Sequence, residues 1–188
     1  GDTSILAAWQ PTGDGTFAYH SVTNRTVGSI DFFRRYSRSI GIVPLEALVP
    51  VGWSNVSFGP YLQVMWSPLD PVSSTNVTLR FVFASESGWF GFGIRPNSTT
   101  GMAGSDVWLF RYNGSDVLVQ DSYGFKNGKP VMDNSQDVMI LNATRGNGYT
   151  IITISRSIDS NDVYDNSFNR SGETSILAAW QPTGDGTF

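Results

Sequence analysis

Apolar and polar residues alternate along several short stretches of the chain, a pattern typical of half-buried β-strands. The clearest stretch is NVTLRFVFAS, in which every second residue is apolar. The predicted strands cover residues 61–67, 76–85, 89–94, 106–112, 116–121, 148–155 and 174–180. Asn-Gly pairs, which favour tight turns, separate several of them. Short strands joined by such turns predict an all-β sandwich.

The same segment stands at both ends of the chain. Residues 1–17, GDTSILAAWQPTGDGTF, differ from residues 172–188 only in having Asp2 where the second copy has Glu173. The two copies start 172 − 1 = 171 residues apart, which is the size of a domain with a linker and far above the roughly 20–50 residues of a solenoid repeat. We interpret the chain as a window on a tandem array with this period.

This interpretation divides the chain into three parts. Residues 1–33 are the closing strand and tail of the preceding repeat, 34–52 are a linker, and 53–188 are a sandwich that the next repeat completes. The linker contains Pro44 and Pro50, which restrict the chain. Donation of residues 1–17 as a strand to a separate chain is the alternative.

The composition argues against a nucleic-acid partner, a membrane span and a disulfide framework. Charged residues make up 15% of the chain and the net charge is −4, with no basic stripe of the kind a nucleic-acid partner requires. No apolar run reaches the roughly 20 residues of a membrane span. With no cysteine, the fold depends on its core and not on disulfides.

N-glycosylation sequons are more frequent than chance allows. About two N-x-[ST] motifs would be expected at random in a chain of this composition, and the chain has seven. They are Asn24, Asn55, Asn76, Asn97, Asn113, Asn142 and Asn169. The excess predicts an extracellular, secreted or cell-surface protein that carries N-linked glycans.

Three stretches in order resemble the DOMON domain family. They are SGWFGFGIRPNSTTGMAGSDVWLFRY (87–112), SRSIDSNDVYDNSF (155–168) and, assembled across the repeat, TSILAAWQPTGDGTFAYHS. The second stretch is similar to the Arg-x-x-x-x-x-Asp-x-x-Asp pattern of the family, here Arg156, Asp162 and Asp165. The resemblance implies an immunoglobulin-like β-sandwich and, in the cytochrome members of the family, a b-type haem held between a Met and a His.

The positions that match these axial ligands are Met102 and His20. Since His20 precedes the domain core, Met102 would pair with the equivalent His of the next repeat. Thioether and imidazole are accepted ligands of haem iron. The predicted apolar wall consists of Trp89, Phe90, Phe92 and Trp108, and the other methionines, Met65, Met132 and Met139, are predicted to be core residues.

Other chemistry has little support. One His and no Cys exclude multi-His metal centres, thiol nucleophiles and iron–sulfur clusters. No nucleophile elbow is present, and we predict that the chain is not an enzyme. Calcium binding by Asp159, Asp162 and Asp165 is an alternative, although the Gly and Glu of an EF-hand loop are missing.

The predicted function is that of a repeat unit in an extracellular, N-glycosylated fibre of head-to-tail DOMON-like domains, each able to bind one haem b. The partners are then other copies of the same domain, and the cofactors are haem b and glycans. One alternative is a cytochrome that acts mainly in electron transfer. A second is a carbohydrate-binding module that uses aromatic residues such as Trp53, Trp66 and Trp108.

Overall fold

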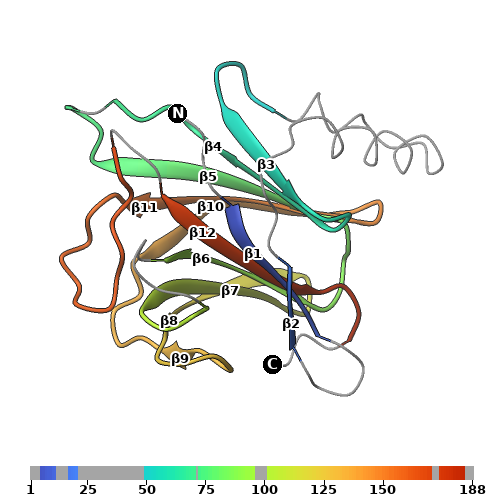
Figure 1. Ribbon diagram of the computed structural model, residues 1–188. Helices are drawn as coiled ribbons and strands as arrows, with labels where there is room; N and C mark the ends of the chain where they lie inside the picture. Colours follow the sequence, from blue (N-terminus) through green and yellow to red (C-terminus); the bar gives the residue numbers. More distant parts are fainter. Residues whose placement is uncertain are drawn as a thin grey trace.

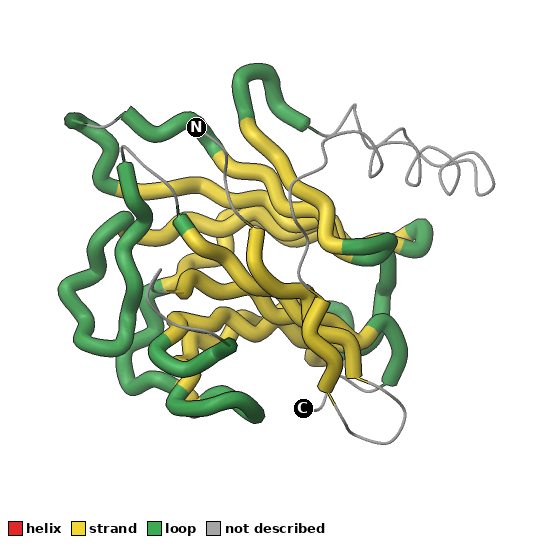
Figure 2. Tube along the Cα trace, viewed as in Figure 1, coloured by secondary structure: helices red, strands yellow, loops and turns green. Residues whose placement is uncertain are grey.

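The structure is a computed structural model that describes residues 5–11, 17–20, 49–70, 72–95, 101–170 and 174–184, the first two ranges as backbone only. Its described part is built from strands and loops (Figure 2). The strands are β1 (Ile5–Pro11), β2 (Phe17–His20), β3 (Ser54–Phe58), β4 (Leu62–Trp66), β5 (Asn76–Phe83), β6 (Trp89–Arg95), β7 (Ser105–Asn113), β8 (Asp116–Gly124), β9 (Val131–Met132), β10 (Val138–Gly146), β11 (Tyr149–Ser157) and β12 (Ser175–Gln181). Among these residues no helix has the length and apolar character needed to cross a membrane.

Two sheets pack face to face as a sandwich (Figure 1). One has seven strands in the order β2-β1-β12-β6-β7-β8-β9, and the other has five in the order β10-β11-β5-β4-β3. All neighbouring strands are antiparallel except β1 and β12, which run parallel. The predicted all-β sandwich is confirmed.

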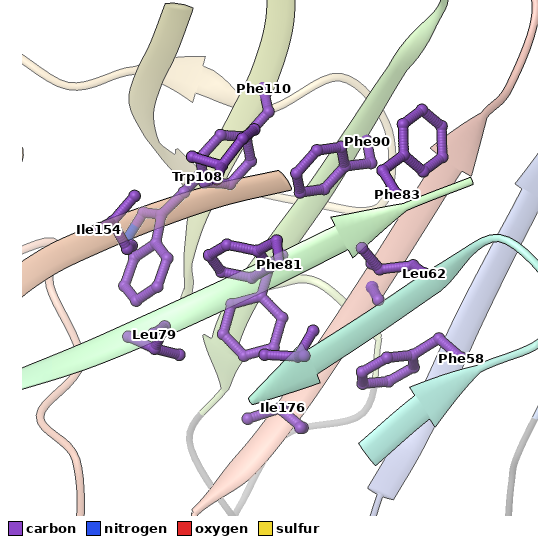
Figure 3. Close-up of a cluster of buried hydrophobic side chains, with 14 of the residues drawn as sticks. Phe58, Leu62, Leu79, Phe81, Phe83, Phe90, Trp108, Phe110, Ile154 and Ile176 are labelled. Atoms are coloured by element: carbon purple, nitrogen blue, oxygen red, sulfur yellow. The ribbon is translucent and has the colours of Figure 1, made fainter. Parts of the chain in front are cut away.

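Aromatic side chains from both sheets fill the core (Figure 3). The ring centroid of Phe81 lies 5.6 Å from that of Phe90, 5.3 Å from Phe92 and 5.0 Å from Phe110. These residues alternate with ones that point to the other side of their sheet. In β5 one face is the more buried, whereas β6 and the first six residues of β7 are buried on both faces. The core therefore forms where the alternation in the sequence predicts it.

The chain reversal between β10 and β11 follows the turn chemistry of the sequence. Gly146 pairs with Tyr149, and the two residues between them, Asn147 and Gly148, have φ angles of 57° and 82°. Two consecutive positive φ angles are the requirement of a two-residue hairpin turn. The predicted Asn-Gly turn is confirmed here.

Two of the methionine predictions are wrong. Met65 is fully buried, but the side chains of Met132 and Met139 are exposed. Met132 belongs to the two-residue edge strand β9, and Met139 lies in the edge strand β10. An edge position leaves one flank of a strand without neighbours, so apolar character alone did not indicate burial.

The predicted division of the chain stays a prediction. Residues 21–48 lie outside the described residues and include most of the predicted linker. The strands resume at β3, directly after that linker. The repeated segment contributes β1 and β12, which lie side by side in one sheet (Figure 1).

Candidate functional site

A rigid turn before β7 presents Met102. Gly101 and Gly104 have φ angles of 77° and 74°, which side chains with a Cβ rarely adopt. The amide of Met102 donates to Asn127 Oδ1 at 2.9 Å, and the amide of Gly104 donates to the carbonyl of Gly124 at 2.7 Å. A Cβ on Gly124 would lie 2.1 Å from the Met102 carbonyl oxygen, so close packing on β8 fixes the turn.

The Met102 side chain lies on the outer face of the seven-stranded sheet. It packs with Val107, Leu109 and Leu177 in a cluster separate from the core between the sheets. The side chains of Leu109 and Leu177 lie over Gly91 and Gly93, at 3.0 and 3.1 Å from where a Cβ would stand. We call these six residues, Met102, Val107, Leu109, Leu177, Gly91 and Gly93, the Met102 face.

Only one of the four predicted wall residues lies on this side of the sheet. Phe90, Phe92 and Trp108 point into the core between the sheets, so the structure does not bring them to Met102 (Figure 3). Trp89 precedes Phe90 and so lies on the opposite side of β6. Its indole donates to Gln181 Oε1 at 3.2 Å. The apolar surroundings of Met102 are therefore mainly aliphatic.

His20 is the last residue of β2, the edge strand of the seven-stranded sheet. Its backbone pairs with Ala8 of β1. Four steps in the strand order separate β2 from β7, which corresponds to about 19 Å across a sheet. The axial role of His20, or of its equivalent in the next repeat, stays a prediction.

A buried ion network closes one end of the sandwich. Nη2 of Arg156 lies 2.5 Å from Asp106 Oδ2 and 2.9 Å from Asp165 Oδ2. The indole of Trp108 donates to Asp106 Oδ1 at 2.8 Å, and the Arg156 guanidinium lies 5.3 Å from the centre of the Trp108 ring. Arg156 and Asp165, singled out by the family resemblance, thus meet in the fold.

The network holds more carboxyl groups than cations among the described residues. Burial raises the pKa of Asp106 to about 8, against the opposing effect of Arg156. Burial first, and then the neighbouring Asp165, raise the pKa of Asp121 to about 7. Burial also raises the pKa of Asp165. Near neutral pH this cluster therefore gains and loses protons.

Sequence reasoning missed Asp106 and Asp121. Both occupy inward-facing positions on β7 and β8, next to apolar residues such as Trp108. An acidic residue at an inward position of an alternating strand is the signal that could have found them. Arg156 was recognised only through the family pattern.

The three aspartates of the calcium alternative are only partly brought together. Carboxylate oxygens of Asp162 and Asp165 lie within 4.8 Å of one another and of Asp133, and Asp165 also groups with Asp106 and Asp121. Asp159 belongs to neither group. Since exposed and paired acidic clusters are common without an ion, this arrangement alone does not define a metal site.

Every sequon asparagine in the described residues is exposed. These are Asn55, Asn76, Asn113, Asn142 and Asn169, whereas Asn24 and Asn97 lie outside the described residues. Asn55 and Asn142 lie on β3 and β10, the two edge strands of the five-stranded sheet. Gln63 donates to Asn55 Oδ1 at 3.2 Å, which leaves Nδ2, the atom that a glycan attaches to, outside that bond.

The tryptophans considered for carbohydrate binding are mostly engaged in packing. Trp108 is fully buried, and Trp66 is half-buried against the core. Trp53 is half-buried with the Arg80 guanidinium 5.6 Å from its ring centre. No two of these rings form an exposed platform among the described residues.

The fold and the site define a two-sheet β-sandwich domain whose outer face presents a methionine among aliphatic side chains. The sequence profile of the DOMON domain family matches residues 62–181, well over half of the 188 residues. The chain belongs to the DOMON family, as the resemblance indicated.

Two solved structures match part of the chain. One is the cytochrome domain of cellobiose dehydrogenase from Myriococcum thermophilum, at 9% identity and a TM-score of 0.46, with 56% of this chain and 55% of that chain covered. The other is the cytochrome b domain of pyranose dehydrogenase from Coprinopsis cinerea, at 12% identity and a TM-score of 0.46, with 56% and 54% covered. The match thus spans about half the length of each of these structures.

Proposed function

We propose that the chain is a repeat unit of an extracellular, N-glycosylated, non-enzymatic fibre built of head-to-tail DOMON domains. The observation that carries this proposal is the sequence repeat itself, whose second copy forms the strand β12 of the sandwich. Ile5 of β1 pairs with Ile176 of β12, and these residues are 176 − 5 = 171 positions apart, one repeat length. Beyond Ile5 the register shifts by one residue.

The setting of β12 supports its role as the closing strand of a domain. All seven of its residues pair with β6, and Ile176, Ala178 and Trp180 are buried in the core. If residues 1–33 end the preceding domain, β1 is the closing strand of that domain. In this structure both edges of β1 are occupied, by β2 and by β12. As the closing strand of a preceding domain, β1 would exchange one of these neighbours for that domain's equivalent of β6.

The exposed sequons fit the same proposal. A fibre of weakly charged domains needs a surface that resists lateral aggregation, and bulky glycans provide one. Glycans on Asn55 and Asn142 would cover both edge strands of the five-stranded sheet. Edge strands left uncovered are sites of unwanted pairing between molecules.

Electron microscopy of the native material tests the fibre. We expect filaments with an axial repeat on the order of 40 Å, the span of a domain of this size. Separate globular particles of one or a few domains would overturn the proposal.

A second candidate function, a b-type cytochrome, is favoured by the register of the β1–β2 hairpin. His20 pairs with Ala8, and Ala179 is the equivalent of Ala8 one repeat later, at 8 + 171 = 179. In a following repeat the equivalent His would stand opposite Ala179 if its strand took the edge of β12 that β1 occupies here. Ala179 alternates with the core residues of β12 and packs against the Met102 cluster. Directly opposed residues of antiparallel strands share a face.

That histidine and Met102 would then lie on the same side of the sheet, and their side chains would be the ones to ligate a haem iron there. A bound haem with Met/His ligation supplies one-electron transfer at a raised potential. The side chains of the Met102 face are 2–7% exposed and supply an apolar lining, in which Leu109 and Leu177 cover the two glycines. The residues present therefore fit the group that the family resemblance implies.

Absorption spectroscopy tests the cytochrome. Native material should show a Soret band that shifts on reduction, and a colourless preparation would refute haem binding. In protein with two consecutive repeats, Met102→Leu should change the spectrum of the reduced form, because the sulfur ligand is lost. Met132→Leu, at an exposed methionine, is the matched control and should leave the spectrum unchanged.

A further inference from the structure

Two polar side chains are buried on the outer face of the seven-stranded sheet without partners. Arg95 is 8% exposed and Ser105 is 0% exposed. Arg95 Nε and Ser105 Oγ have no hydrogen-bond partner in the described part of the molecule. Buried polar atoms are nearly always paired, so this pair of unsatisfied donors requires an explanation.

The strand register places the two residues side by side next to the Met102 face. Ile94 of β6 pairs with Asp106 of β7, so Arg95 and Ser105 are the next opposed pair. They alternate with the inward-facing Ile94 and Asp106 and so share their side with Gly93 and Val107. A polar end thus adjoins the apolar cluster around Met102, whose side chains are 2–7% exposed.

Arg95 contrasts with Arg156, the other deeply buried arginine. Arg156 has carboxylates of Asp106 and Asp165 within ion-pair distance. For Arg95 the described residues provide no carboxylate. An unpaired buried charge is costly, and a planar carboxylate is the group that matches a guanidinium best.

We propose that Arg95 and Ser105 bind the carboxylate of an apolar ligand whose body lies on the Met102 face. Arg95 supplies the charge and an N–H donor, and the Ser105 hydroxyl supplies a second donor. The ligand class is an apolar molecule with one carboxylate end. With haem as the ligand the inference rests on the cytochrome proposal, and the carboxylate is then a propionate. A fatty acid shares this chemistry.

Titration of the full chain with three probes tests the pair. The probes are haemin, haemin dimethyl ester and laurate, followed by quenching of tryptophan fluorescence. We expect the chain to bind haemin at least about tenfold more tightly than the ester, since the ester cannot accept a charge-assisted bond in the same way. Arg95→Met should abolish this difference and Ser105→Ala should reduce it. Arg111→Met removes an exposed arginine on the same face of β7 and should leave the affinities for haemin and for the ester unchanged.

The outcomes separate this inference from the cytochrome proposal. Equal binding of haemin to the wild type and to Arg95→Met would overturn the carboxylate pair and leave haem binding intact. Binding of laurate but not haemin, with dependence on Arg95, would support the pair and refute the haem. Failure of every carboxylate probe to bind would overturn the inference.

A stability measurement without ligand gives a second, independent readout. If Arg95 is held unpaired for a ligand, Arg95→Met should raise the melting temperature of the ligand-free chain by about 2 °C or more, because an uncompensated charge is removed. Arg95→Gln should raise it less, since the amide remains polar. A fall in melting temperature in Arg95→Met would show that Arg95 is a structural residue and would overturn the proposal.

Discussion

Replacement of Arg156 by methionine removes the cation of the buried network at the end of the sandwich. Met and Arg are similar in length, so little cavity forms and the effect is mainly electrostatic. The guanidinium is 2% exposed and ion-paired with Asp106 and Asp165 at 2.5 and 2.9 Å. Its loss leaves buried carboxylates without a counter-charge.

Two effects set how much stability Arg156→Met loses: the loss of the ion pair and the protonation of the remaining carboxyl groups. Removing one partner of a buried ion pair costs about 3–5 kcal/mol when the remaining charge stays ionised. The carboxyl groups of Asp106 and Asp121, with pKa values raised to about 8 and about 7, escape this cost by binding a proton. Because Arg156 lowers both pKa values, its removal keeps these groups protonated to a higher pH. We therefore expect Arg156→Met to lose about 1–2 kcal/mol at pH 5 and more than this at pH 8, rising towards about 3–5 kcal/mol at higher pH.

The free energy of unfolding of the wild type should also depend on pH, in a direction that follows from the same pKa shifts. Both folded-state pKa values lie above the ordinary aspartate value of 3.8, so the folded chain binds protons that the unfolded chain releases. Stability is then greatest below about pH 4. It falls as the pH rises from there to about 7 and about 8, by at most about 1.4 kcal/mol per pH unit for each proton, and levels off above. Asp121→Asn should flatten this dependence.

Urea unfolding followed by tryptophan fluorescence measures these free energies, since Trp108 contacts the network. Arg111→Met, at an exposed arginine, is the control and should change stability by less than about 0.5 kcal/mol. A loss for Arg156→Met below about 1 kcal/mol at pH 8, or equal losses at pH 5 and pH 8, would refute the electrostatic reasoning.

Three further substitutions test the packing and the surface. Gly93→Ala should cost more stability in urea unfolding than Gly91→Ala. A Cβ at Gly93 would lie 2.4 Å from the backbone oxygen of Asp106, whereas a Cβ at Gly91 would meet the end of the Leu109 side chain at 3.0 Å. Equal losses of stability for the two variants would contradict this. Phe81→Ala should lose about 3–5 kcal/mol in the same assay, as a fully buried ring does, and a loss under about 1 kcal/mol would contradict the assigned core. Asn142→Gln should lower the glycan mass of protein from a glycosylating host by one glycan, and an unchanged mass spectrum would show that this sequon is not used.

The strands that bury one whole face could be predicted from the sequence, and those at the edges could not. Alternation over β5 gives the core residues Val77, Leu79, Phe81 and Phe83. The edge strand β10 has a register shift between Ile140 and Asn142 and is largely exposed, so it shows no alternation. β3 and β9 are short and mostly exposed. Edge strands lack the burial that creates a pattern.

The candidate site shows the same limit at the level of single residues. Met102 was recognised because its Gly-flanked loop matches the family motif, and the structure places it on a defined apolar face. Phe90, Phe92 and Trp108 were predicted beside it and lie on the other side of the sheet. Alternation fixes which residues share a side but not which side is the core. Which side becomes the core depends on where the second sheet packs, and no local sequence pattern predicts that.

The two buried arginines suggest how stability and binding are divided between the two sides of one sheet. Arg156 faces inward, where Asp106 and Asp165 compensate its charge and the pair closes the sandwich. Arg95 faces outward, and the described residues provide no such compensation. Buried polar groups without a partner lower stability and are expected mainly at functional sites, where a bound ligand supplies the missing partner. If both arginines served stability alone, their removal would have the same sign of effect; opposite signs for Arg156→Met and Arg95→Met would assign the inner side to folding and the outer side to binding.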